Sequence, residues 1–185
     1  MKERGKSIRS FAGHLLLASP SMTDPNFRRT VILMSAHDGE GAMGAVLNRP
    51  AGRTLGVLNP EFASTTLGQL AVFRGGPVEA DKLILAAWQT RDDLGEFQLN
   101  FGLEPNRAIE LMGTQGVTVR AFLGYAGWGK GQLENEMRHQ TWYTAPVTDY
   151  NLASESGTGL WRLILGSLGP DLKLLAEEPD DPAMN

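Results

Sequence analysis

The 185-residue chain has 42% hydrophobic and 21% charged residues, a composition far from that of disordered or membrane proteins and suited to one globular domain. It has no cysteine, which excludes disulfides, thiolate metal sites and cysteine nucleophiles. The net charge of −4 divides into +3 over residues 1–10, −4 over residues 177–181 and −3 between them. An acidic body disfavours general binding of nucleic acid, which needs a clustered basic face.

The two ends of the chain differ from the body in composition. We expect residues 1–10 to form a basic flexible leader and residues 176–185 an acidic flexible tail, which leaves a single domain over residues 11–175. No apolar run approaches the roughly 18 residues of a membrane span. The apolar stretch over residues 15–18 is too short for a signal peptide. The sequence therefore predicts a cytoplasmic protein that does not contact a membrane.

Short apolar runs flanked by turn residues predict strands in the first half of the chain. The runs cover residues 13–18, 30–35 and 44–47. Between the first two runs, residues 24–27 read Asp-Pro-Asn-Phe and predict an Asx-type turn. Residues 31–34 are apolar at every position, which is typical of a strand covered on both faces. Between the second and third runs, residues 38–41 read Asp-Gly-Glu-Gly and accept positive φ, so the pattern predicts a hairpin.

The second half of the chain alternates predicted strands and helices. Strands are expected over residues 82–88 and 117–124, and helices over residues 105–112, 132–140 and 159–168. Gly113 is expected to end the first of these helices, and the Gly-Pro pair after residue 168 to end the last. Because the early hairpin excludes an all-parallel sheet, the sheet should be mixed.

A glycine-rich segment over residues 124–132 lies between a predicted strand and a predicted helix and nearly matches a P-loop. Gly124, Gly129 and Lys130 satisfy the first seven positions, but Gly131 stands where a hydroxyl must bind Mg²⁺. This mismatch argues against nucleotide hydrolysis. The four glycines can form a nest of N–H donors for an anion. The alternative is a tight turn with Trp128 packed in the core.

Two further segments carry groups suited to an anion. Arg49 follows Asn48 at the end of the predicted hairpin, and a guanidinium can grip a carboxylate or phosphate with two parallel hydrogen bonds. Gly75 and Gly76 precede Pro77 in a sharp reversal whose backbone amides can line a pocket. Each also has a simpler interpretation, a solvated or salt-bridged arginine and an ordinary turn.

The residues needed for metal or hydrolase chemistry do not form a recognisable pattern. His14, His37 and His139 lack the spacing of zinc ligands, and there is no G-x-S-x-G nucleophile elbow. We therefore expect no metal and no cofactor.

Five segments in order resemble the AlgH/YqgE family: residues 13–20, 24–33, 41–50, 73–78 and 124–134. The resemblance extends over about residues 11–165. It implies a bacterial, intracellular α/β (α+β) protein in which a mixed, mostly antiparallel, bifurcated sheet curls into a pseudo-barrel with flanking helices. Some members of that family are called transcriptional regulators, but this sequence has no convincing helix-turn-helix.

Three hypotheses of function follow. The first is a binding or regulatory module for a small anionic ligand, with a site built from Asn48, Arg49, Gly75, Gly76, Tyr125, Gly127, Trp128 and Gln132. The second is an enzyme whose site is assembled by folding from the same three segments, with Tyr125, Glu134, Arg49 or a serine as candidates. The third is a structural, protein-interaction or transcription-regulatory role. The sequence predicts no oligomeric state.

Overall fold

The computed structural model describes residues 10–91, 96–147, 152 and 157–179. Residues 1–9 of the predicted leader and most of the predicted tail lie outside these ranges, so their flexibility stays a prediction. Ala176 is buried and belongs to the last helix, which ends at Glu177.

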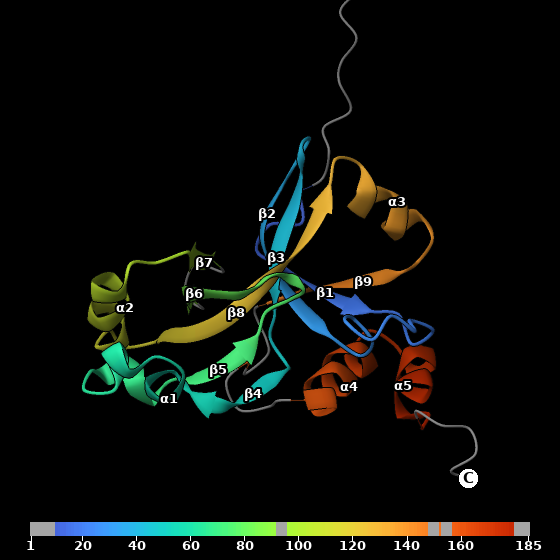
Figure 1. Cartoon of the computed structure of the whole chain (residues 1–185). Helices are drawn as coiled ribbons and strands as arrows, with labels where there is room; N and C mark the ends of the chain where they lie inside the picture. Colours follow the sequence, from blue (N-terminus) through green and yellow to red (C-terminus); the bar gives the residue numbers. More distant parts are fainter. Residues whose placement is uncertain (1–9, 92–95, 148–151, 153–156, 180–185) are drawn as a thin grey trace, which may run out of the picture.

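One mixed sheet organises the described part of the chain (Figure 1). Its strands are β1 His14–Ala18, β2 Val31–Asp38, β3 Gly41–Val46, β4 Pro50–Thr54, β5 Ala71–Arg74, β6 Val78–Arg91, β7 Glu96–Phe101, β8 Val117–Gly129 and β9 Trp142–Pro146. The order is β4-β5-β8-β3-β2-β1-β9, with β6 and β7 branching from β8. The β5–β8 pair is parallel, and the other pairs are antiparallel. The expected mixed, mostly antiparallel sheet is therefore confirmed.

The sheet forks along β8. The first part of this strand lies between β5 and β6, where Ala121 pairs with both Val72 and Leu85. The last part pairs with β3 instead, with Trp128 opposite Ala42. The bifurcated sheet that the resemblance implied is thus produced by one long strand that changes partners. The sheet stays open and does not close into a barrel.

Gly124 marks the point where β8 changes partners. Before it, Arg120 and Phe122 contact the central hydrophobic cluster; after it, Tyr125 does so, and Ala126 turns to a different cluster. Strand side chains alternate with a period of two, so this change of parity requires an irregularity. Gly124 supplies it with φ of 69°, a left-handed conformation that glycine adopts without steric cost.

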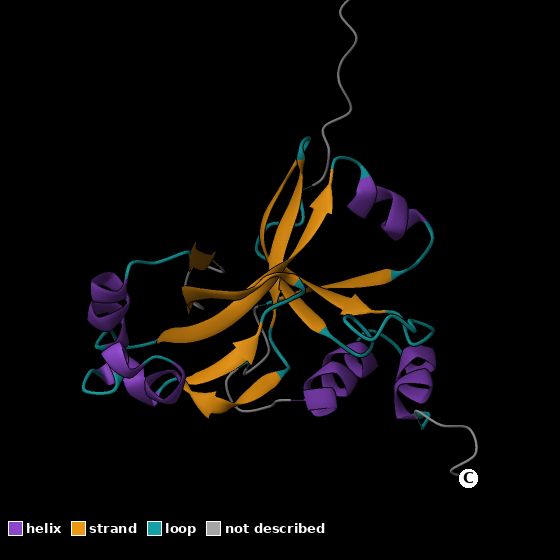
Figure 2. Cartoon of the chain, in the orientation of Figure 1, coloured by secondary structure: helices purple, strands orange, loops and turns teal. Residues whose placement is uncertain are grey.

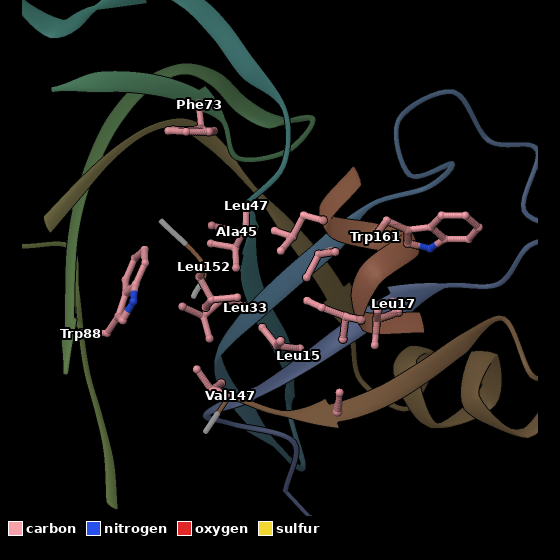
Figure 3. Close-up of a cluster of buried hydrophobic side chains, with 14 of the residues drawn as sticks. Leu15, Leu17, Leu33, Ala45, Leu47, Phe73, Trp88, Val147, Leu152 and Trp161 are labelled. Carbon is pink, nitrogen blue, oxygen red and sulfur yellow. The ribbon is translucent and has the colours of Figure 1, made fainter. Parts of the chain in front are cut away.

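The β1–β2 pair is buried on both faces, which was predicted for β2 from its uninterrupted apolar run. Leu15 and Leu33 face the central cluster shown in Figure 3, whereas Leu16 and Ile32 face a second cluster on the opposite side. Helix α4, Gly157–Ser167, covers the first face and inserts Trp161, whose Nε1 donates to the Ala18 carbonyl at 2.8 Å.

The remaining helices lie at the two ends of the sheet (Figure 2). They are α1 Leu55–Leu58, the short 3₁₀ helices Pro60–Phe62 and Thr66–Gln69, α2 Pro105–Met112, α3 Gln132–Arg138 and α5 Pro170–Glu177. The elements between β4 and β5, together with α2, cover a third apolar cluster on β5, β6 and β8. Helix α3 packs near β8 and β9, and α5 packs on α4.

Two sequence expectations need correction. The segment over residues 124–132 is not a loop: β8 continues to Gly129, and only Lys130 and Gly131 separate it from α3. The Gly-Pro pair at residues 169 and 170 does end α4, but Pro170 also begins α5, which the sequence analysis missed. Proline is well tolerated at the first helical position because its missing N–H would have no intrahelical partner there.

Candidate functional site

A large cavity gathers segments that are distant in the sequence. It has a volume of about 710 Å³ and lies where the loop before β2, the β3–β4 connection, the end of β5 and the start of α4 meet. Its lining residues are Thr23, Pro25, Arg28, Arg29, Asn48, Arg49, Pro50, Arg74, Gly157 and Thr158. Four of them are arginines, and no acidic residue of the described part of the chain joins them.

Arg49 is held in place by the backbone of the facing loop. Its Nη1 donates to the Pro25 carbonyl at 2.8 Å and its Nη2 to the Arg28 carbonyl at 3.1 Å. Burial lowers the pKa of Arg49, the positive charges of Arg28 and Arg74 lower it further, and Asp24 opposes them. Since an arginine remains protonated in proteins, the lowered pKa indicates a charged guanidinium that is partly desolvated and lies near other positive charges.

An Asx turn presents the loop that carries Arg28 and Arg29. The Asp24 carboxylate accepts from the Asn26 N–H at 2.8 Å, and the Asp24 carbonyl accepts from the Arg28 N–H at 2.8 Å. This confirms the turn expected from the Asp-Pro-Asn sequence. Arg29 is buried, and its Nη2 donates to the Glu178 carbonyl at 2.6 Å, which brings the residue after α5 to the arginine cluster.

Asn48 joins three parts of the cavity wall. Its Nδ2 donates to the carbonyls of Arg29 at 2.9 Å and Gly157 at 2.8 Å, and its Oδ1 accepts from the Val31 N–H at 2.9 Å. The side chain is buried, so these bonds are shielded from water. Asn48 therefore positions the arginine loop and the start of α4 relative to β2.

A second, smaller cavity adjoins the first. It has a volume of about 350 Å³, and Arg49 and Arg74 line both cavities. The remaining lining residues are largely apolar: Asn26, Val46, Gly76, Pro77, Ala80 and Leu123. The Arg74 N–H donates to the Arg49 carbonyl at 2.8 Å, so the backbones of the two shared arginines are fixed relative to each other.

Gly75 and Gly76 allow the β5–β6 connection to approach β8 closely. A Cβ added at Gly75 would lie 2.3 Å from the Gly124 carbonyl oxygen, and one at Gly76 would lie 2.2 Å from the Tyr125 carbonyl carbon. Both distances are far below van der Waals contact. The glycines are therefore explained by close backbone packing, and Gly76 also forms part of the smaller cavity.

The aromatic part of the expected site lies elsewhere. The Nε1 atoms of Trp128 and Trp142 both donate to Oε2 of Glu136, at 2.9 and 2.7 Å, and Gln132 donates to Oε1 at 2.9 Å. Phe27 stacks against Trp128 with the ring centroids 6.5 Å apart. These residues form a cluster between β8, α3 and β9, which we call the tryptophan cluster.

The eight expected site residues thus divide between regions. Asn48, Arg49 and Gly76 line the arginine cavities, and Gly75 is next to them in the chain. The others do not line either cavity: Tyr125 packs against the central hydrophobic cluster, Gly127 is exposed on β8, and Trp128 and Gln132 belong to the tryptophan cluster. Whether any of the eight binds a ligand stays a prediction.

Sequence reasoning missed the other arginines of the cavities. Arg28 and Arg29 follow the Asx turn that was expected on its sequence, and Arg74 directly precedes the Gly-Gly-Pro turn. The signal available was that the turn at residues 24–27 and the turn at residues 75–77 are each directly beside an arginine. These arginines could be assigned to one site only after folding brings the segments together.

Groups suited to acid–base or metal chemistry lie away from these cavities. In the ranges that the structure describes, no three His, Asp or Glu side chains are placed to share a metal ion. Glu134, a candidate from the sequence, contacts buried His37 with Oε1 3.1 Å from Nε2 and lines neither cavity. Over the same ranges, no helix has the length and hydrophobicity needed to span a membrane.

The fold and cavities define the class of protein as a single-domain α/β protein with a forked sheet and an arginine-lined surface site. A family model described as AlgH-like matches residues 15–173, so the chain belongs to the AlgH-like family. A UPF0301 protein of Streptomyces coelicolor is 37% identical over 96% of this chain and 97% of its own length. A UPF0301 protein of Cytophaga hutchinsonii is 32% identical over 94% of this chain and 98% of its own length.

Solved structures agree with this assignment. The AlgH protein of Pseudomonas aeruginosa is 29% identical, with a TM-score of 0.65 over 98% of this chain and all of that one. A protein of Corynebacterium diphtheriae has a TM-score of 0.70 over 96% of this chain and 95% of its own, at 22% identity, which shows likeness of fold alone. The names of these relatives state no ligand or reaction.

Proposed function

We propose that the protein binds a small anionic ligand in the arginine-lined cavity and acts as a binding or regulatory module. The observation that carries the proposal is the lining itself: four arginines from three separate segments and no carboxylate among the described lining residues. Positive charges gathered around one cavity raise the local electrostatic potential, which attracts an anion.

The cavity wall adds two features that favour an anion. Arg49 is anchored by two backbone carbonyls, so less side-chain entropy is lost when its remaining N–H groups bind a ligand. Helix α4 begins at the cavity with Gly157 and Thr158 and has no acidic residue in its first turn. The positive end of its dipole therefore adds to the field of the arginines.

Binding fits the arrangement better than catalysis. Within the described ranges, neither cavity is lined by a histidine or carboxylate that could act as a general base. Guanidinium groups do suit bidentate recognition of phosphate or carboxylate, and hydrogen bonds to charged groups contribute about 1.5–3 kcal/mol each.

Thermal unfolding in the presence of phosphate and citrate tests this function. A ligand at 100 times its Kd stabilises the native state by about 2.7 kcal/mol, which raises the Tm by roughly 5–10 °C for a chain of this size. We expect this rise for the wild-type protein with at least one of the two anions and its loss in Arg49→Ala.

The matched control is Arg53→Ala, which removes an exposed arginine from β4 that lines neither cavity. It should retain the shift. Because Arg49→Ala also loses two hydrogen bonds to the loop, each variant is compared with itself without ligand. Equal shifts in the wild-type protein and Arg49→Ala, or no shift with either anion, would contradict the proposed function.

A further inference from the structure

The two adjoining cavities differ in chemistry although they share a wall. The larger one combines arginines with polar backbone and the start of α4. The smaller one is lined mainly by Val46, Pro77, Ala80 and Leu123. Arg49 and Arg74 line both, so a molecule held by these arginines can extend in either direction.

We propose that the ligand is a phosphomonoester, with its phosphate in the larger cavity and a compact apolar group in the smaller one. This inference rests on the anion-binding function proposed above and assigns the chemical class of the ligand. A phosphate dianion offers three terminal oxygens, which match several guanidinium groups better than the two oxygens of one carboxylate.

The dimensions of the two cavities agree with a ligand of this kind. Small-molecule sites commonly measure about 300–1,000 Å³, are mostly apolar and contain a few fixed polar groups. The smaller cavity, at about 350 Å³, has room for a single ring or short branched chain. Burying on the order of 100 Å² of apolar ligand surface there would strengthen binding roughly 50-fold over that of inorganic phosphate.

The backbone fixes the boundary between the two cavities. The Arg49 carbonyl accepts from the Arg74 N–H, and the Gly75 carbonyl accepts from the Val46 N–H, both at 2.8 Å. The first bond extends the β4–β5 pair, and the second ties the end of β3 to the residue after β5, where the cavities meet. The distance between a bound phosphate and the apolar lining is therefore set by the sheet, so the site should discriminate among organic phosphates by the shape of the group attached.

Isothermal titration with three probes tests the inference. The probes are inorganic phosphate, phenyl phosphate with its apolar ring, and glycerol 1-phosphate with its polar body. We expect the wild-type protein to bind phenyl phosphate at least about tenfold more tightly than the other two. Similar affinity for all three probes would overturn the inference and leave the anion-binding function intact.

A cavity-filling variant locates the apolar group. Ala80 is exposed and lines the smaller cavity but not the larger one. Ala80→Phe should therefore fill the smaller cavity without disturbing the fold. We expect it to lose the preference for phenyl phosphate and keep its affinity for inorganic phosphate. Ala36→Phe, at an exposed position of β2 outside both cavities, should keep the preference.

The variants separate the two proposals. Loss of binding of all three probes in Arg49→Ala would support a site in which Arg49 holds the phosphate at the boundary of the two cavities. A wild-type protein that binds none of the probes would overturn both proposals. An Ala80→Phe protein with wild-type melting temperature and an unchanged preference would overturn the placement of the apolar group alone.

Discussion

The tryptophan cluster and the arginine cavities are both polar regions on the forked sheet, but they differ in how their charges are satisfied. In the first, the Glu136 carboxylate accepts from two indoles and the Gln132 amide. In the second, arginines from separate segments line a cavity without a carboxylate from the described lining.

This difference separates a structural role from a binding role. A charge whose hydrogen-bonding partners all come from the protein stabilises the fold, because its desolvation is offset within the native state. In the proposed site, charges of one sign converge on a cavity, where their combined field attracts an anion. By this comparison, Trp128 has a structural role in the tryptophan cluster, and Arg49 remains the centre of the proposed binding site.

The largest expected effect tests whether the cavity region is as rigid as the tryptophan cluster. In Gly76→Ala, the new methyl group would lie 2.2 Å from the Tyr125 backbone, and φ is 154°. The two backbone segments must separate, so we expect the free energy of unfolding to fall by about 3–4 kcal/mol. Urea denaturation measures the loss.

Gly39→Ala provides the control for this substitution. Gly39 lies in the β2–β3 turn with no atom within 4 Å of an added Cβ, so the change should stay within about 0.5 kcal/mol. Similar small losses for Gly76→Ala and Gly39→Ala would mean that the wall of the smaller cavity is loosely packed and can rearrange.

The second test removes the carboxylate at the centre of the tryptophan cluster. Glu136→Ala leaves the Trp128 and Trp142 indole N–H groups without their shared acceptor. We expect the free energy of unfolding to fall by about 2–3 kcal/mol, because each lost bond joined a donor to a charged group. Chemical denaturation followed by tryptophan fluorescence measures the loss and any rearrangement of the indoles.

The matched control for Glu136 lies on α2. Glu110 makes an exposed ion pair with Arg107, and exposed pairs of this kind contribute little, so Glu110→Ala should cost less than about 0.5 kcal/mol. Anion binding should survive in Glu136→Ala if the two regions are independent. An equal loss of stability in both variants would show that the indoles find other acceptors.

Much of the fold could be predicted from the sequence because the signals are local. The uninterrupted apolar run of β2 indicated burial on both faces, and the Asp-Gly-Glu-Gly turn indicated the hairpin between β2 and β3. Helix α5 was missed because the Gly-Pro pair before it was interpreted only as a stop, although Pro170 also suits a helix start.

The site was harder to predict because its determinants are long-range. Gly124 shifts the alternation of β8, so the strand that follows lost its period-two pattern and resembled a glycine-rich loop. Glu136 gave no signal, since its donors Trp128 and Trp142 come from β8 and β9. Arg49 was identified by its chemistry, but its neighbour Arg74 became evident only through strand pairing.

The smallest expected effect concerns a second satisfied charge near the tryptophan cluster. A hydrogen bond from its own backbone N–H lowers the pKa of Glu134, the contact with His37 also lowers it, and burial opposes both. A carboxylate with a depressed folded-state pKa binds fewer protons in the native than in the unfolded state between the two pKa values. Its stabilising contribution is therefore complete above the ordinary glutamate pKa and is lost as the pH falls through the lower, folded value.

We expect the Tm of the wild-type protein to fall more steeply than that of Glu134→Gln as the pH is lowered below about 4.5, the ordinary glutamate value. Glu110→Gln should follow the wild-type profile, since its exposed pair with Arg107 contributes little. Scanning calorimetry over this pH range measures the slopes. Parallel profiles for the wild-type protein and Glu134→Gln would mean that neither the backbone N–H nor the contact with His37 stabilises the charged Glu134 carboxylate. Glu136 would then be the satisfied charge of the two.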